Sequence, residues 1–215
     1  MIRVVIADDH AVVRNGLRHI LEREADVEVV GEASKAPEVP QILRETTPDV
    51  ILLDLSMPGR SGLELVRLIK TDHACTRVLV LTMHAEEQYV VRAFRAGAAG
   101  YLTKDSAAKD LIEALRKVAA GGVYVSPEMA EKLALGVQEK TSAPHASLSD
   151  RELEVFRRIV NGESLTEIAE ALCVSAKTVS TYKMRLLEKL QLRSDAALVR
   201  YAIQAGLFPE DDAPL

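Results

Sequence analysis

Residues 50–55 read VILLDL, a run of four aliphatic residues that ends at an aspartate, Asp54. Three other short runs have the same form and end in polar residues: VVIADD at 4–9, VLVLT at 78–82 and GYLTK at 100–104. Runs this short, rich in Val, Ile and Leu and separated by segments of helical periodicity, are typical of parallel strands buried on both faces. They predict an α/β fold with a doubly wound, five-stranded parallel sheet.

Helical segments alternate with the expected strands, as right-handed crossovers between parallel strands require. The strands are expected at about 2–7, 27–31, 49–53, 77–82 and 99–102. Parallel strands share a direction, so the residues at their carboxyl ends gather at one edge of the sheet, where open α/β folds place their chemistry. The polar residues expected at this edge are Asp8, Asp9, Asp54, Thr82 and Lys104.

Three carboxylates in one cleft repel one another and are costly without a compensating cation. A Mg²⁺ ion resolves the conflict, because it prefers one or two carboxylates together with water and phosphate oxygens. Lys104 can then offer a point charge to one phosphoryl oxygen, and Thr82 can donate its hydroxyl to another. The residues therefore predict a Mg²⁺-dependent, phosphoryl-binding cleft.

The alternation of strands and helices stops after residue 122. Ser126-Pro127 predicts the start of a short helix, and the segment VQEKTSAPHAS at 137–147 predicts a linker. From Leu148 on, the periodicity is helical and predicts four short helices. The expected organisation is a first domain at 1–122, a short helix and linker at 123–147, an all-α domain at 148–208 and an acidic tail at 209–215.

Two of the expected helices have the spacing of a helix-turn-helix motif. Their apolar faces consist of Leu165, Ile168, Ala169 and Leu172 in the first helix and Val179, Leu186, Leu187 and Leu190 in the second. The opposite face of the second helix offers donors, a methyl group and positive charge, which suit a helix that enters the DNA major groove. We expect base contacts from Lys177, Ser180, Thr181 and Met184, and phosphate contacts from Lys183 and Arg185.

The net charge of −5, taken alone, argues against a nucleic-acid partner. The charge is unevenly distributed, however, because residues 177–193 carry five basic residues and one acidic residue, Glu188. No apolar run approaches the roughly 18 residues of a membrane span and no signal peptide is evident, so we expect a cytoplasmic protein without a membrane partner. Cys75 and Cys173 lie in different expected domains and are interpreted as buried, reduced thiols.

With these motifs assembled, the chain resembles the two-component response regulators of the NarL/FixJ class. In this class a receiver domain of flavodoxin-like fold precedes a LuxR-type helix-turn-helix domain. The resemblance extends from Ile2 to about Phe208. The motifs that carry it are DDH at 8–10, LDLSMPGRSG at 53–62, LTMH at 81–84, GYLTKD at 100–105, LSDRELEVF at 148–156 and EIAEALCVSAKTVSTYKMRLLEKL at 167–190.

The resemblance implies roles for individual residues of the cleft. Asp54 would be the phosphoacceptor, and the Mg²⁺ ligands would be Asp54, Asp9 and the backbone carbonyl of Ser56, with Asp8 contributing indirectly. Thr82 and Tyr101 would form the switch pair, and Lys104 would contact the phosphate.

It also implies a transcription regulator that accepts a phosphoryl group from a sensor histidine kinase, binds double-stranded DNA as a homodimer once phosphorylated, and has RNA polymerase as a further possible partner. Enzymatic activity would be limited to the regulator's own phosphorylation and dephosphorylation.

Two features depart from the pattern of the class. Pro37 and Pro40 would fall in or near the first turn of the helix after the second strand, so that helix is expected to begin late. Ser180 and Met184 stand where some members of the class have lysine. The base preference of those members therefore cannot be transferred to this chain.

Two alternatives stay open at the level of sequence. One is a Mg²⁺-dependent phosphohydrolase that forms an aspartyl-phosphate, but such an enzyme needs a second carboxylate two residues after the nucleophile, where this chain has Ser56. The other is a DNA-binding protein that acts independently of phosphorylation, although the chain retains every residue of the phosphorylation cleft.

Overall fold

The computed structural model describes residues 1–59, 61–83, 87–106, 108–136 and 144–208. The chain divides into two compact units, Met1–Leu135 and Gly136–Leu215, and each is described by itself. This division concerns compactness, so the domain boundaries given above stay a prediction. Most of the expected linker and the whole acidic tail lie outside the described residues.

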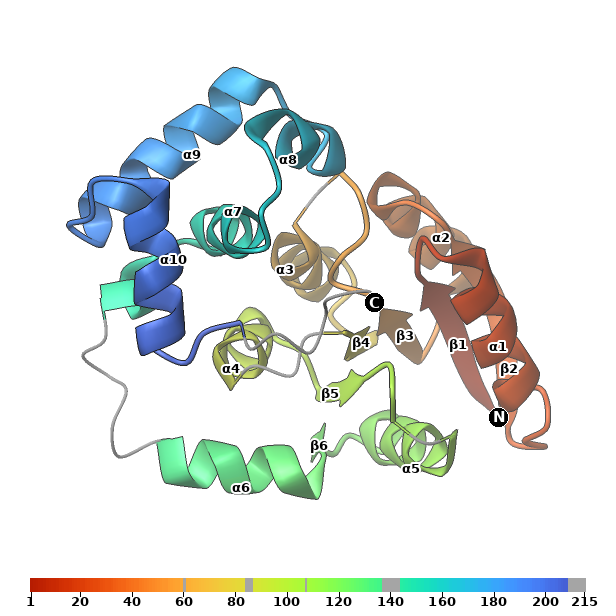
Figure 1. Cartoon of the computed structure of the whole chain (residues 1–215). Coiled ribbons are helices and arrows are strands. Elements are labelled where there is room, and N and C mark those ends of the chain that lie inside the picture. The colour runs from red at the N-terminus through yellow and green to blue at the C-terminus, as the bar shows by residue number, and fades with distance from the viewer. Residues whose placement is uncertain (60, 84–86, 107, 137–143, 209–215) are drawn as a thin grey trace. The chain divides into compact units, whose positions relative to one another are not determined.

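The first unit contains a parallel sheet with strand order β2-β1-β3-β4-β5-β6 (Figure 1). Its strands are β1 (Ile2–Ala7), β2 (Val27–Ala33), β3 (Val50–Leu53), β4 (Arg77–Thr82), β5 (Gly100–Thr103) and β6 (Tyr124–Val125). The predicted parallel α/β sheet is confirmed, but the sheet has six strands among the described residues, so the expected number of five is wrong. The sixth strand has only two residues, which pair with Gly100 and Tyr101, and so short a strand has no periodicity to detect.

Helices cover both faces of the sheet, and Figure 1 shows α5 on one side of the strands with α3 and α4 on the other. The helices of this unit are α1 (Ala11–Leu21), α2 (Val39–Thr46), α3 (Gly62–Asp72), α4 (Glu87–Ala96), α5 (Ala108–Ala119) and all but the last residue of α6 (Pro127–Gly136). Every residue of β3 is buried, as a strand covered on both faces requires. One of the two core layers contains Val4, Ile6, Leu52 and Leu79 of the strands with Leu17, Leu21, Leu111 and Leu115 of α1 and α5.

The expected late start of α2 is present. A 3₁₀ turn, η1 (Ala36–Glu38), contains Pro37, and α2 begins only at Val39 with Pro40 in its first turn. A proline is tolerated there because the first backbone N–H groups of a helix have no intrahelical partner. The late start of α2 predicted from Pro37 and Pro40 is therefore confirmed.

The second unit is entirely helical among its described residues. It contains η2 (Pro144–Ser147), α7 (Asp150–Val160), α8 (Leu165–Ala171), α9 (Ala176–Lys189) and α10 (Asp195–Gln204). Four serines cap α7 to α10, and the first two caps are reciprocal capping boxes with Glu152 and Glu167. Val179 and Leu186 of α9 are fully buried, as expected for the apolar face of this helix.

Two further expectations concern the exposure of the cysteines and the presence of membrane-spanning segments. Cys75 and Cys173 are both exposed free thiols, so the interpretation as buried cysteines is wrong. Cys173 lies in the turn between α8 and α9 with a φ of 52°, a conformation found in tight turns rather than in a packed element. Among the described residues, no helix has the length and apolar character needed to cross a membrane.

Candidate phosphoryl-transfer site and nucleic-acid interface

The two central carboxylates follow neighbouring strands, and the strand pairing fixes their positions. Asp8 continues β1 by donating its backbone N–H to Ala33 O at 3.1 Å, and Asp54 continues β3 by donating to Ala7 O at 2.8 Å. Both residues are almost completely buried, at 1 % and 2 % exposure. The edge of the sheet therefore holds two carboxylates that water hardly reaches.

Lys104 neutralises this pair of carboxylates. Its Nζ donates to Asp54 Oδ2 at 2.8 Å and forms an ion pair with Asp8 Oδ2 at the same distance. The Lys104 backbone N–H donates to Thr82 O at 2.9 Å, which holds the residue that follows β5 against the end of β4. The predicted convergence of Asp8, Asp54, Thr82 and Lys104 at one sheet edge is thus observed.

Burial dominates the titration of the phosphoacceptor candidate. Desolvation raises the pKa of Asp54 above its usual value, and the nearby Asp8 raises it further, while Lys104 and the Ser56 N–H only partly offset these effects. Burial alone would lower the pKa of Lys104, but its hydrogen bonds to the two carboxylates outweigh burial and raise it. Lys104 is therefore held as a cation next to carboxylates whose negative charge is costly.

Local turns orient the carboxylate groups. Asp54 Oδ1 accepts a hydrogen bond from Ser56 N at 3.0 Å, and Asp8 Oδ1 accepts one from His10 N at 2.8 Å. Helix α3 begins very close to the loop that follows Asp54: a Cβ added to Gly62 would lie only 2.4 Å from Leu55 Cα. Only glycine permits this close approach, which fixes the segment that follows Asp54.

Asp8, Asp9, His10 and Asp54 can each offer one ligand atom within 4.8 Å of the others. Asp9 Oδ1 is a buried oxygen that accepts no hydrogen bond from the described residues, with His10 Nδ1 beside it at 3.0 Å, whereas Asp8 Oδ2 has Lys104 Nζ 2.8 Å away. Carboxylate oxygens left in this state are suitable ligands for a hard divalent cation. The acidic cluster predicted from the sequence therefore suits Mg²⁺.

Thr82 and Tyr101 lie on the same face of the sheet. Val80 of β4 pairs with Tyr101 of β5, and Thr82 pairs with Thr103, so Thr82 and Tyr101 are diagonal neighbours. Both side chains are buried, at 0 % and 2 % exposure. The proximity that a switch pair requires is present.

Arg14 is a member of the site that the sequence analysis did not identify. Its Nη1 donates to the backbone oxygen of Asp8 at 2.7 Å, and its Nε lies 3.6 Å from Glu32 Oε2. Arg14 thus connects α1 and β2 with the loop that carries the acidic pair. A basic residue in an exposed first helix gives no sequence signal for such a contact.

In the second unit, the expected DNA-facing side of α9 is open to solvent. Lys177 and Ser180 are exposed, and the Met184 side chain is 63 % exposed although it is apolar. Val179, Leu186 and Leu190 on the opposite side are buried, as predicted. The helix therefore has one packed face and one face available to a partner.

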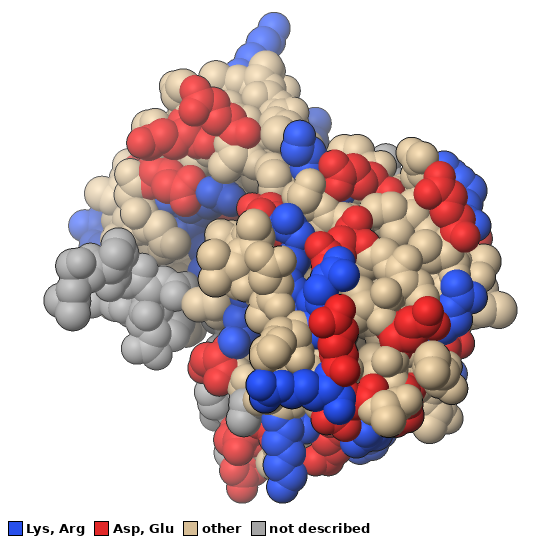
Figure 2. Space-filling view, turned by 90° about the vertical axis from the view of Figure 1, so that its right-hand side faces the viewer, with Lys and Arg blue, Asp and Glu red and all other residues tan. Residues whose placement is uncertain are grey.

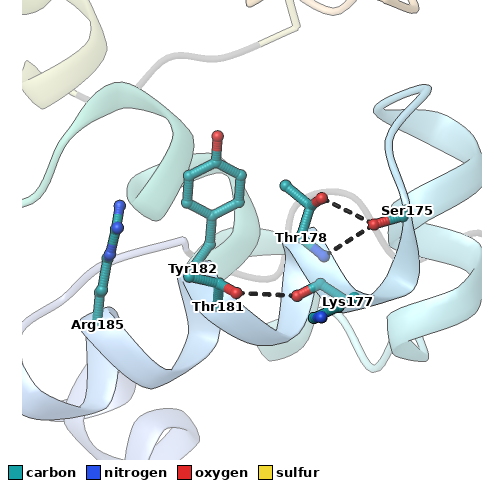
Figure 3. A pocket seen from close by; sticks show the side chains of 6 residues that line it. All are labelled: Ser175, Lys177, Thr178, Thr181, Tyr182 and Arg185. Carbon is teal, nitrogen blue, oxygen red and sulfur yellow. Dashed lines mark hydrogen bonds between the residues drawn. The ribbon is translucent and has the colours of Figure 1, made fainter.

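A hollow of about 340 Å³ lies along one flank of α9 (Figure 3). Its lining consists of Ser175, Lys177, Thr178, Thr181, Tyr182 and Arg185. Figure 3 shows the side chains of Thr178, Tyr182 and Arg185 rising from the same side of the helix. The sequence analysis missed Thr178 and Tyr182, although their spacing from Arg185 of seven and three residues places them on one helical stripe.

Lys183 lies on the other flank of α9, where its Nζ is 2.6 Å from Asp195 Oδ2 of α10. Of the two residues expected to contact phosphate, Lys183 thus already has an acidic neighbour, whereas Arg185 lines the hollow. Acidic and basic side chains are interspersed over the face shown in Figure 2. Within α9 itself, the basic residues Lys177, Lys183, Arg185 and Lys189 outnumber the one acidic residue, Glu188.

Comparison with known proteins identifies both units. Residues 4–116 match the response regulator receiver domain family, and residues 146–202 match the LuxR family of bacterial regulatory proteins. The response regulator UvrY of Escherichia coli K12 is 41% identical over 209 residues, which cover 96% of each chain. The response regulator GacA of Pseudomonas aeruginosa PAO1 is 38% identical, covering 96% of this chain and 98% of GacA.

Solved structures of the response regulator RcsB from Salmonella agree. One is 32% identical with a TM-score of 0.72, covering 94% of this chain and 97% of RcsB. Another, RcsB bound to the promoter rprA in the presence of phosphomimetic BeF₃⁻, has the same identity and a TM-score of 0.68, covering 93% and 97%.

A parallel α/β unit with this acidic cleft, followed by a helix-turn-helix unit, defines a response regulator with a DNA-binding output domain. The chain belongs to the response regulators that join a receiver domain to a LuxR-type helix-turn-helix domain, the NarL/FixJ class.

Proposed function

We propose that the chain is a cytoplasmic transcription regulator whose DNA binding is controlled by phosphorylation of Asp54. The phosphoryl donor is a phosphohistidine on a sensor histidine kinase. The observation that carries the proposal is the contact of Lys104 Nζ with both Asp54 and Asp8 at 2.8 Å in a buried cleft. A cation fixed there can stabilise charge on a transferred phosphoryl group.

In the transfer, a carboxylate oxygen of Asp54 attacks phosphorus, and the bond between phosphorus and the imidazole nitrogen of the kinase breaks with its electron pair going to nitrogen. Asp9, Asp54 and the backbone carbonyl of Ser56, with Asp8 acting indirectly, would hold a Mg²⁺ ion, which would supply positive charge between phosphate and carboxylates. Lys104 then contacts a phosphoryl oxygen instead of the free carboxylate. Catalysis by the chain consists of positioning and electrostatics, so it is a phosphoacceptor and not a conventional enzyme.

The signal leaves the cleft through Thr82 and Tyr101. The Thr82 hydroxyl turns toward the new phosphoryl oxygens, and Tyr101, its diagonal neighbour on β5, moves into the space released. This exchange is a shift between two populated arrangements of the α4 and β5 face. Its consequence is that the protein dimerises on DNA.

DNA recognition belongs to α9. We assign base contacts to Lys177, Ser180, Thr181 and Met184, and phosphate contacts to Lys183 and Arg185. The related RcsB is described bound to promoter DNA with a phosphomimetic and as dimers on DNA, which supports double-stranded DNA and a homodimer for this chain. RNA polymerase is a further partner in this proposal.

The phosphohydrolase alternative is disfavoured by the cleft itself. Two residues after Asp54, where such an enzyme needs its second carboxylate, stands Ser56, whose N–H donates to Asp54 Oδ1 at 3.0 Å. The other alternative is a protein that binds DNA independently of phosphorylation. Such a protein would have the same DNA affinity with and without a phosphoryl group on Asp54.

Phosphorylation is tested by incubating the protein with acetyl phosphate and Mg²⁺ and measuring its intact mass. Wild-type protein is expected to gain one phosphoryl group, and Asp54→Asn none, because the amide keeps the shape but is not a nucleophile. Asp9→Asn is expected to require more Mg²⁺ for the same gain. Acid-labile phosphate that persists in Asp54→Asn would refute the assignment of the acceptor.

A further inference from the structure

We propose that Arg14 is a positioning residue for the phosphoryl-transfer cleft, because its guanidinium fixes the peptide unit that joins Asp8 to Asp9. This inference rests on the proposed function and goes beyond it by naming a basic residue that acts through the backbone of the acidic pair. Arg14 thereby differs from Lys104, whose ammonium is assigned to the phosphoryl group itself.

The Arg14 side chain closes a short loop at the edge of the sheet. The Arg14 backbone N–H donates to His10 O at 3.1 Å in the first turn of α1, so the residue is fixed to the helix that follows the acidic pair. Its Nη1 donates to the backbone oxygen of Asp8 at 2.7 Å. Only 16 % of the Arg14 side chain is exposed, and a hydrogen bond from a charged donor is stronger where water is largely excluded.

This hydrogen bond acts on Asp9 as well as on Asp8. The Asp8 carbonyl and the Asp9 N–H belong to one planar peptide unit, so a donor that fixes the carbonyl oxygen also fixes the plane from which Asp9 continues. Asp8 has further anchors, because its N–H donates to Ala33 O at 3.1 Å and its Oδ2 lies 2.8 Å from Lys104 Nζ. The Asp9 side chain is 29 % exposed, and its Oδ1 accepts no hydrogen bond from the described residues. The direction of the Asp9 carboxylate therefore depends more on its backbone than that of Asp8 does.

Glu32 of β2 supports the guanidinium from the neighbouring strand. Glu32 pairs with Ile6 of β1 in the sheet register, and its Oε2 lies 3.6 Å from Arg14 Nε. Because the guanidinium group is planar and rigid, a carboxylate beside Nε restricts the direction in which Nη1 points. A lysine at this position would have a single ammonium for both contacts. Arg14 thus approaches the Asp8 carbonyl in a defined orientation.

Positioning of this kind changes metal affinity more than it changes the chemical step. Asp9 is one of the residues assigned to Mg²⁺, and outer partners that orient metal ligands typically contribute about 10–100-fold in affinity. A purely structural role of Arg14 would lower the free energy of unfolding without changing the Mg²⁺ dependence of the folded protein. The two roles are therefore separable by experiment.

The test compares the wild-type full chain with Arg14→Met, which removes the donors and keeps an apolar stem. Arg18→Met is the matched control, because Arg18 lies in the same helix and donates to Glu32, the carboxylate that supports Arg14. Arg14→Lys keeps the charge without the planar set of donors, and it serves as the second variant if Arg14→Met does not fold. Mg²⁺ affinity is measured by calorimetry, and the initial rate of phosphorylation by acetyl phosphate is measured by intact mass over a range of Mg²⁺ concentrations. With this small donor, contacts to a kinase do not affect the result.

Arg14→Met is expected to weaken Mg²⁺ binding about tenfold and to raise the Mg²⁺ concentration for half-maximal rate equally, while the rate at saturating Mg²⁺ stays within about threefold of wild type. Arg14→Lys is expected to weaken Mg²⁺ binding at least about twofold, and Arg18→Met is expected to leave it unchanged. Wild-type Mg²⁺ affinity in the folded Arg14 variants, or an equal loss in Arg18→Met, would overturn this inference while the proposed function stands. If the wild type neither binds Mg²⁺ nor gains a phosphoryl group, the proposed function itself is refuted.

Discussion

Replacing Lys104 by methionine removes the ammonium from the cleft while keeping an apolar stem of similar volume. In the wild type, this ammonium lies 2.8 Å from both Asp8 Oδ2 and Asp54 Oδ2, and the Lys104 side chain is only 8% exposed. Lys104→Met therefore leaves two carboxylates buried without their counter-ion. The structure predicts that the receiver unit is strongly destabilised at neutral pH.

The magnitude follows from the burial of all three groups. Removing one partner from a buried ion pair costs about 3–5 kcal/mol, most of it from the charge left behind. We expect about 3 kcal/mol at pH 7 without divalent ions, near the lower end, because protonation of Asp54 can relieve the charge. Mg²⁺ well above its dissociation constant is expected to restore about 1–3 kcal/mol, since a bound cation replaces the missing charge.

The pH dependence has a defined sign. Burial already raises the pKa of Asp54 above 3.8, and losing Lys104 raises it further. Ionised Asp54 therefore costs stability above its folded pKa, and protonation removes this cost as pH falls. The stability difference between Lys104→Met and wild type is expected to shrink as pH is lowered from 7 through the raised folded pKa of Asp54.

Hydrogen exchange measured by mass spectrometry suits this question, because peptides from β1, β3 and β5 report the receiver unit separately from the helix-turn-helix unit. Asp54→Asn serves as the matched background, where Lys104→Met is expected to cost less than half as much. A loss below about 1 kcal/mol at pH 7, or a loss that is insensitive to both pH and Mg²⁺, would contradict the reasoning.

Other predictions concern the helical unit. Glu152→Gln is expected to lower the free energy of unfolding in urea by about 1–2 kcal/mol, because Glu152 is buried and accepts a hydrogen bond from Lys189 at 2.6 Å. Glu167→Gln, in the exposed second capping box, is the control and is expected to cost less. Equal losses in the two variants would argue against this explanation. Burial alone would raise the pKa of Glu152, but Lys189 and the capping hydrogen bonds lower it below 4.5, so its contribution is present above pH 4.5 and is lost as pH falls through the folded pKa. Arg185→Ala is expected to reduce the slope of log K against log salt by roughly 0.9. Thr181→Ala is expected to lower base discrimination by about 1 kcal/mol at an unchanged slope, and identical behaviour of these two variants would refute the assigned division of α9.

The sequence predicted the sheet and the convergence of its polar residues because both depend on strand periodicity. A strand such as β3 is aliphatic throughout, and its direction places Asp54 at the same edge as Asp8. Two of the four capping serines, Ser149 and Ser164, were equally predictable, because a serine three residues before glutamate is a local pattern. Short-range signals of this kind needed no knowledge of the tertiary structure.

The features that the sequence missed depend on tertiary contacts. Strand β6 exists because two residues pair with β5, and Arg14 belongs to the cleft because the entry of α1 brings its guanidinium to the Asp8 carbonyl. The pairing of Lys183 with Asp195 joins two helices and leaves no mark in the periodicity of either. Side-chain partners across elements thus required the structure.

The most direct test of the account is the DNA affinity of the full chain with and without phosphorylation. DNA fragments selected in vitro with the acetyl-phosphate-treated protein provide the probe, and binding is measured for wild type and Asp54→Asn with and without acetyl phosphate and Mg²⁺. The account predicts that phosphorylation tightens wild-type binding at least about tenfold and has no effect on Asp54→Asn. The same affinity for phosphorylated and unmodified wild type, or an equal gain in Asp54→Asn, would contradict it.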